Sequence, residues 1–131
     1  MEYGEPGIVS VLDINGQASG IAEPVVVTKP WGWERWTFNS PLYCQKLIHI
    51  DHAKSCSMHL HVRKHECLLV VSGRLTIEAI INKQTRSFDL IPGQAFVIAP
   101  GFPHRLLALT GEVELVEAST QHFESDSVKL A

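Results

Sequence analysis

Turn-forming residues recur at short and even intervals through the last two-thirds of the sequence. They lie near residues 51–54, 63–64, 72–74, 82–83, 92–94, 100–101 and 110–111. Between them lie short runs rich in Val, Ile, Leu and Phe, at residues 67–71, 75–81, 95–99 and 113–118. Turns spaced about 8–12 residues apart are typical of sandwiches and barrels of short antiparallel strands. No window keeps apolar residues at helical spacing over three turns, so the sequence predicts an all-β fold.

The chain of 131 residues has room for one compact domain, and 45% hydrophobic residues can supply its core. Residues 1–24 differ from the rest, because they contain four glycines and only one strand-like run, at 8–14. We expect this extension to supply an edge strand, or a strand exchanged with a second subunit. The barrel itself is predicted to span residues 25–131.

Charge and composition exclude several classes of function. Eleven basic against fourteen acidic residues give a net charge of −3, whereas nucleic-acid-binding domains usually carry a basic excess. No apolar run is long enough to span a bilayer, and the N-terminus lacks the pattern of a secretory signal. The three cysteines contain no CxxC pair, which favours reduced thiols and a cytoplasmic location. The motifs of nucleotide hydrolysis and of serine hydrolases are absent from the sequence.

Four residues carry the strongest chemical signal. His59 and His61 are one residue apart, so a strand would direct both imidazoles to the same face. Glu66 begins the run 67–71, which is expected to return antiparallel beside that strand and to set the carboxylate against the histidines. His104 follows the turn at 100–103 and opens another strand. Each is unremarkable alone, but three neutral imidazoles and one carboxylate inside a small barrel suit a divalent transition metal.

The order and spacing of these residues resemble the two sequence blocks of the cupin superfamily. The matching pattern is His59-x-His61-x4-Glu66-x6-Gly73, then Gly93, then Pro100-Gly101-x-x-His104. In the second block the proline is shifted by one position, and Ala108 stands where Asn is frequent. The resemblance implies a single-domain cupin, which is a double-stranded β-helix or jelly-roll barrel. It also implies that His59, His61, Glu66 and His104 bind one divalent ion, of Zn, Mn, Fe or Ni.

A finer resemblance lies outside these blocks. The segment Lys-Pro-Trp-Gly-Trp-Glu at residues 29–34 is similar to the entry motif of the cupin-type mannose-6-phosphate isomerases. Residues 46–47, 103–105 and the tail from 117 to 129 also fit, so the resemblance covers about residues 25–130. His59 stands where those isomerases commonly carry Gln, which makes this site richer in metal ligands.

Three further residues are candidates for catalysis. Lys46 is expected either to point into the barrel and bind an anionic substrate, or to be a solvated edge residue. Arg105 follows His104, so strand alternation places it on the opposite face unless a bulge intervenes. Glu117 is a candidate base or partner of a ligand, with an exposed strand carboxylate as the alternative. The remaining histidines are expected at the surface, and the three tryptophans in core and lid packing.

The leading interpretation is a metal-dependent enzyme that isomerises a sugar phosphate or a similar small polar metabolite. A metal-dependent dioxygenase and a non-catalytic cupin that binds a sugar or metabolite remain open, because fold and ligands are common to all three. A homodimer is also predicted, since the strand at 8–14 has no obvious partner inside the barrel.

Overall fold

The computed structural model describes residues 7–14 and 17–130. These residues form thirteen strands and one short 3-10 helix, and no helix among them is long and apolar enough to cross a membrane. The elements in chain order are β1 (Gly7–Ile14), β2 (Gln17–Glu23), β3 (Val25–Lys29), β4 (Gly32–Asn39), β5 (Cys44–Ile50), β6 (His59–His61), β7 (Glu66–Ser72), β8 (Leu75–Ile81), β9 (Gln84–Leu90), β10 (Ala95–Ile98), β11 (His104–Leu107), β12 (Val113–Ser119), η1 (Glu124–Asp126) and β13 (Ser127–Lys129).

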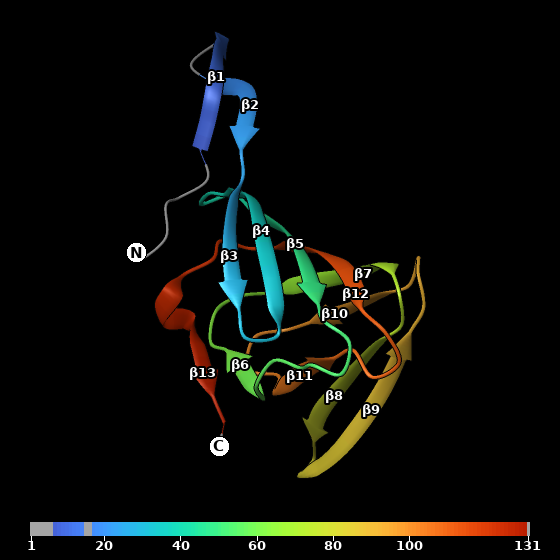
Figure 1. Cartoon of the computed structure of the whole chain (residues 1–131). Coiled ribbons are helices and arrows are strands. Elements are labelled where there is room, and N and C mark those ends of the chain that lie inside the picture. Colours follow the sequence, from blue (N-terminus) through green and yellow to red (C-terminus); the bar gives the residue numbers. More distant parts are fainter. Residues whose placement is uncertain (1–6, 15–16, 131) are drawn as a thin grey trace.

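Two antiparallel sheets face each other and form the barrel (Figure 1). The larger sheet has the strand order β10-β7-β12-β5-β4-β3, and the smaller has the order β13-β6-β11-β8-β9. This is the all-β jelly-roll arrangement that the turn spacing predicts. The expected strands at 75–81 and 113–118 correspond closely to β8 and β12.

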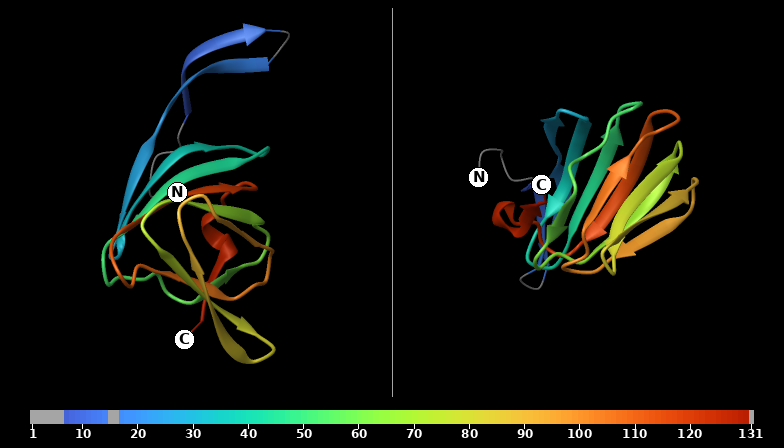
Figure 2. Two further views of the ribbon diagram at one scale, coloured as in Figure 1. Left: turned by 90° about the vertical axis from the view of Figure 1, so that its right-hand side faces the viewer. Right: turned by 90° about the horizontal axis from the view of Figure 1, so that it is seen from below.

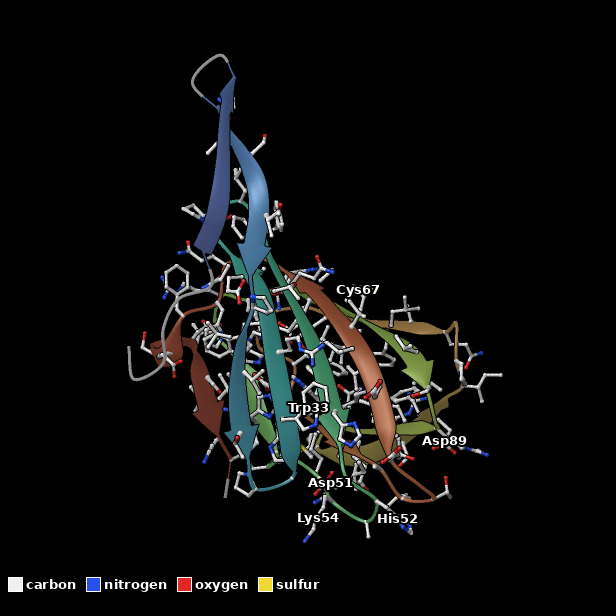
Figure 3. All side chains as sticks on the ribbon, turned by 45° about the horizontal axis from the view of Figure 1, so that its top comes forward. Trp33, Asp51, His52, Lys54, Cys67 and Asp89 are labelled. Carbon is white, nitrogen blue, oxygen red and sulfur yellow. The ribbon has the colours of Figure 1, made fainter. Side chains whose placement is uncertain are left out.

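The core follows from the alternation of side chains along the three central strands of the larger sheet. In β5, β7 and β12 every second residue points inward. Figure 3 labels two residues on the outer face of the sheet, Cys67 on β7 and Trp33 on β4. The inward residues at one end of the barrel are apolar and almost fully buried: Ile48, Ile50, Leu68, Val70, Val113 and Leu115. At the other end the same faces carry Lys46, Glu66 and Glu117. The barrel therefore has a dry end and a polar end.

The strand that contains His59 and His61 does not pair as the sequence suggests. We predicted that residues 67–71 return beside it, but β6 pairs with β11 and β13, whereas β7 pairs with β10 and β12. That prediction is therefore wrong. Residues 62–65 carry the chain from one sheet to the other, and the Asp126 side chain accepts hydrogen bonds from the backbone N–H groups of Arg63 and Lys64. Glu66 thus faces the histidines from the opposite sheet.

Before the barrel, β1 and β2 form an antiparallel hairpin that is a separate two-stranded sheet. The hairpin projects away from the body of the barrel, as Figure 1 and the left view of Figure 2 show. The strand-like run at 8–14 thus pairs with a strand of the same extension, which the sequence analysis did not identify. Strand β3, the first strand of the larger sheet, begins at Val25.

Two turn glycines have the left-handed backbone conformation but differ in their surroundings. Gly73, between β7 and β8, has φ +80°, and a Cβ there would overlap the carbonyl oxygen of Glu112. Gly93 has φ +91°, and a Cβ there would meet no atom within 4 Å.

This contrast yields a stability prediction. Gly93→Ala should lower the free energy of unfolding by about 1 kcal/mol, which is the conformational cost alone. Gly73→Ala should cost at least about 3 kcal/mol, because the backbone carbonyl must also move. Urea denaturation of both variants beside the parent protein measures the difference. Equal losses in the two variants would contradict the role of the contact with Glu112.

Candidate metal centre

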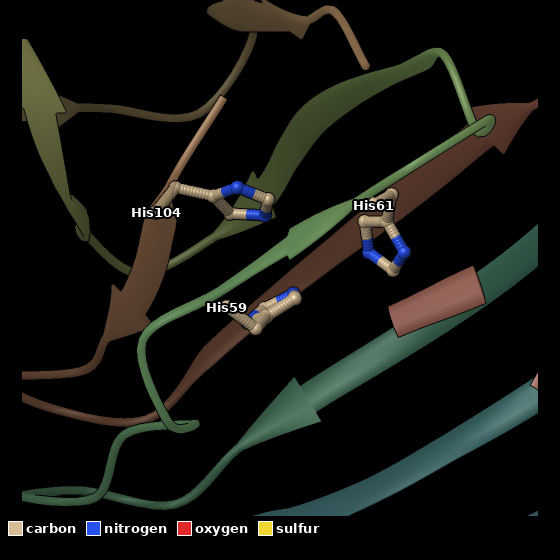
Figure 4. Close-up of side chains that lie close together, drawn as sticks. All are labelled: His59, His61 and His104. Atoms are coloured by element: carbon tan, nitrogen blue, oxygen red, sulfur yellow. The ribbon is translucent and has the colours of Figure 1, made fainter. Parts of the chain in front are cut away.

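Three imidazoles meet at the polar end of the barrel. His59 and His61 lie on the same face of β6, and His104 at the start of β11 pairs directly with His59. One ring nitrogen from each histidine lies within 4.8 Å of the other two (Figure 4). The ring centroids of His59 and His104 are 4.4 Å apart. Among the described residues, this is the one cluster of His, Cys, Asp or Glu that has metal-binding geometry.

Hydrogen bonds to the backbone orient two of these rings, those of His59 and His104, for metal binding. His59 Nδ1 lies 2.8 Å from the backbone oxygen of Ser57, and His104 Nδ1 lies 2.8 Å from that of Phe102. A carbonyl oxygen only accepts, so each Nδ1 carries the proton and each Nε2 keeps its lone pair for a metal.

The histidines are neutral over the physiological range of pH. Burial lowers the pKa of His61 to about 3 and that of His104 to about 4, and it lowers the pKa of His59 as well. Protonation of the imidazoles therefore does not compete with a metal ion at neutral pH.

Glu66 completes the cluster from the opposite sheet. Its Oε2 lies 3.6 Å from His61 Nε2, and its Oε1 lies 3.8 Å from His104 Nε2. Burial, followed by the nearby carboxylate of Glu117, raises the pKa of Glu66 to about 7. Glu66 Oε2 is buried, and its contact with Lys64 Nζ, at 3.3 Å, is an ion pair without hydrogen-bond geometry. A divalent cation would satisfy this oxygen and the three free imidazole nitrogens together, so the residues present fit a metal ion.

A buried lysine that the sequence analysis missed lies beside Glu66. Lys64 Nζ is 3.0 Å from Glu117 Oε2 and 3.3 Å from Glu66 Oε2, and its side chain is 3% exposed. Burial opposes the charge of Lys64, but Glu117 and Glu66 outweigh burial and raise its pKa. Conversely, Lys64 and Lys46 hold the pKa of Glu117 well below its usual range despite burial. Lys64 and Glu117 are thus a buried ion pair.

The histidine cluster and the ion pair line a single cavity of about 760 Å³. Lys46, also buried, points into this cavity, as one of the two alternatives for it predicts. Its Nζ lies 3.1 Å from His122 Nδ1 and 3.7 Å from Glu34 Oε1, and 4.6 Å from the centre of the Trp36 ring. His122, expected at the surface, in fact lines the cavity, where burial and then Lys46 lower its pKa.

Arg105, the third catalytic candidate, lies outside the cavity. Its guanidinium pairs with Glu78 on β8, because it follows the inward-facing His104 and no bulge reverses the alternation. The structure therefore does not bring Arg105 to the site. His49 lies on the outer face, stacked on Trp33 and hydrogen-bonded to Glu114.

The C-terminal segment closes the polar end. Strand β13 pairs with β6, so it lies directly beside the two metal-site histidines. The buried Asp126 has its Oδ2 3.6 Å from His61 Nδ1, and the same carboxylate accepts the N–H groups of Arg63 and Lys64. One carboxylate thus holds the turn that carries Lys64 and also lies beside an imidazole of the histidine cluster. Asp126 belongs to the tail that resembles the isomerases, but the sequence indicated no role for it, because its partners lie more than sixty residues earlier.

The fold and the site define the class of protein. Residues 52–131, more than half of the chain, match the family described as Cupin, and the chain belongs to that family. It is a single-domain jelly-roll cupin that carries a three-histidine cluster suited to a divalent metal. No curated protein is similar enough in sequence to count as a relative.

Several solved structures share the fold. The capsular polysaccharide assembling protein CapF of Staphylococcus aureus is 17% identical, with a TM-score of 0.73 over 83% of this chain and 34% of CapF. The oxalate decarboxylase of Bacillus subtilis, which has Mn(II) centres, is 15% identical, with a TM-score of 0.74 over 82% of this chain and 30% of the enzyme. KdgF of Halomonas sp. is 20% identical, with a TM-score of 0.64 over 76% of this chain and 86% of KdgF. This chain spans about a third of the length of the first two.

If Glu66 is a ligand, Glu66→Gln removes the negative charge while keeping the shape of the side chain. We expect the affinity for Zn²⁺ at neutral pH to fall at least about tenfold. The parent affinity should rise with pH up to about 7, because the carboxyl must ionise to bind, and this rise should be absent in the variant. Chelator competition across pH measures both effects. The exposed Glu112→Gln is the control, and an unchanged affinity in Glu66→Gln would exclude Glu66 as a ligand.

Asp126→Asn tests the carboxylate behind His61. The amide keeps one oxygen, for one of the two backbone N–H groups, and loses the negative charge beside the His61 imidazole, so metal affinity should fall about 10–100-fold. Asp89→Asn is the matched control. The Asp89 carboxylate likewise accepts two hydrogen bonds, from Arg74 and Thr76, but it lies on the β8–β9 hairpin away from the histidine cluster. Equal chelator-competition curves for the two variants would contradict the role given to Asp126.

Proposed function

We propose that this cupin is a metal-dependent enzyme that interconverts the aldose and ketose forms of a small anionic sugar, with a sugar phosphate as the substrate class. One observation carries the proposal. A three-histidine cluster and a set of buried acid and base groups line the same cavity. The resemblance of residues 29–34 and 117–129 to the cupin-type mannose-6-phosphate isomerases supports the same reaction.

The charge of the cavity favours an anionic substrate. Its lining carries equal numbers of basic and acidic side chains, which are Lys29, Lys46, Lys64 and Lys129 against Glu34, Glu66, Glu117 and Glu124. The histidines contribute no charge, because burial keeps them neutral. A divalent ion would therefore leave an excess of two positive charges in the cavity. A small dianion such as a phosphate ester restores the balance.

The isomerisation moves a proton between two neighbouring carbons of the sugar. A bound divalent ion supplies polarisation of the carbonyl group, which makes that proton more acidic. In this proposal Glu117, which lines the cavity, carries that proton from one carbon to the other. Lys46 binds the substrate and exchanges a proton with one of its oxygens, and its side chain is held in the cavity wall by His122 and Glu34. Glu117 holds Lys64 in place and balances its charge, and its low pKa keeps it ionised.

The first experiment is reconstitution. Protein freed of metal is loaded with Zn²⁺, Mn²⁺, Fe²⁺ or Ni²⁺ and tested on a panel of aldose and ketose phosphates beside the corresponding neutral sugars. The proposal expects interconversion of a phosphate ester with one of these metals and little with its neutral counterpart. Oxygen consumption without isomerisation, or binding without turnover, would overturn it in favour of a dioxygenase or a binding protein.

Lys46→Met separates catalysis from metal binding. The loss of the ammonium should lower kcat by about 100-fold or more, whereas metal content should not change, because lysine is not a ligand here. Lys54→Met, at an exposed lysine in the loop after β5, is the matched control. A normal kcat in Lys46→Met would remove Lys46 from the mechanism, and a loss of bound metal would assign it a structural role.

A further inference from the structure

The ammonium of Lys64 lies against the carboxylate that completes the candidate metal centre. Its Nζ is 3.3 Å from Glu66 Oε2, and the same oxygen faces His61 Nε2 at 3.6 Å. The side chains of Lys64 and Glu66 are both almost fully buried, and all three residues line the cavity. One buried oxygen is therefore shared between a cation of the chain itself and the histidine cluster that would hold a metal ion.

The two carboxylates that Lys64 contacts hold its ammonium in different ways. Nζ donates a hydrogen bond of 3.0 Å to Glu117 Oε2, whereas its contact with Glu66 Oε2 lacks hydrogen-bond geometry. A charge-assisted hydrogen bond is stronger and more directed than a contact by charge alone. The ammonium is therefore anchored on Glu117, and a metal ion can take the Glu66 oxygen without breaking that hydrogen bond.

Lys64 stays beside Glu66 even when another cation takes that oxygen. The backbone N–H of Lys64 donates to the buried Asp126 Oδ2 at 3.1 Å, and its ammonium is held by Glu117. Buried charges are screened much less than charges in water, so repulsion between the ammonium and a dication is strong here. A metal ion bound to Glu66 must therefore overcome a positive charge that the fold keeps in place.

We propose that Lys64 competes with the metal ion for Glu66 and thereby sets the metal affinity of the centre. In the metal-free protein its ammonium pairs the buried Glu66 carboxylate, which the three neutral imidazoles cannot do. A divalent ion takes over the Glu66 oxygen, and the ammonium remains on Glu117. Glu117 weakens the competition, because it draws the ammonium toward itself and offsets its charge. The proposal concerns metal affinity, so it does not depend on the reaction assigned to the cavity.

Two variants give effects of opposite sign. Glu117→Gln leaves Glu66 as the carboxylate partner of the ammonium, so the affinity for Zn²⁺ should fall at least about tenfold. Lys64→Met added to Glu117→Gln removes the competing cation while keeping the length of the side chain. The affinity should then return to the parent value or exceed it. Chelator competition at about pH 8, where the Glu66 carboxyl is ionised, measures both effects.

The double variant also guards against a folding defect. Lys64→Met alone would leave Glu117 buried without its closest cation, whereas the double variant removes both charges of the pair together. Circular dichroism and urea denaturation show whether each variant retains the barrel. The matched control is the exposed ion pair of Arg74 and Asp89, at 2.9 Å on the β8–β9 hairpin. Neither Asp89→Asn nor Asp89→Asn combined with Arg74→Met should change the affinity for Zn²⁺.

The sign of the second step decides the role of Lys64. Recovery of Zn²⁺ affinity in the double variant supports competition between the ammonium and the metal ion. A double variant that binds Zn²⁺ as weakly as Glu117→Gln, or more weakly, overturns the proposal, because Lys64 would then have no effect or would support metal binding by positioning Glu66. An unchanged affinity in Glu117→Gln also overturns it, since the ammonium released from Glu117 would not compete.

Discussion

The buried ion pair between Lys64 and Glu117 is the interaction on which the polar end of the barrel depends. A carboxylate that is 4% exposed in the middle of a sheet is tolerated only when cations face it. Lys64 does so from the turn before β7, and Lys46 lies directly opposite Glu117 in the neighbouring strand β5. The pair also sets the position of Glu66, whose Oε2 lies 3.3 Å from the same ammonium. The histidine cluster is therefore built against this charge network.

The sequence predicted the histidine cluster well, because its signal is local and periodic. One intervening residue is enough to place His59 and His61 on the same face of a strand, and the turn before His104 marks the start of another. Alternation also predicted that Arg105 points away from His104 unless a bulge reverses it. The dry core could be anticipated in the same way, since the apolar runs at 75–81 and 113–118 are strands of the barrel.

What the sequence did not predict depends on contacts between distant segments. Lys64 follows Arg63 in a short basic turn, and such a turn is usually solvated, yet Asp126 and Glu117 draw its backbone and its ammonium inward. The predicted pairing of β6 with β7 was wrong for a related reason. Residues 62–65 are as short as a hairpin loop, but Asp126 satisfies two of their N–H groups and lets the chain cross between sheets. His122 was likewise assigned to the surface, because its partner Lys46 lies 76 residues earlier.

The division of the barrel into a dry and a polar end also separates stability from chemistry. On β5, Ile48 and Ile50 bury apolar surface while Lys46, two residues before Ile48, points into the cavity. On β12, Val113 and Leu115 bury apolar surface four and two residues before Glu117. The apolar residues stabilise the sheets whether or not a metal is bound, unlike a zinc finger, whose folding free energy comes from the ion. Selection can therefore change the residues of the polar end, and with them the reaction, while the alternation that closes the barrel is kept.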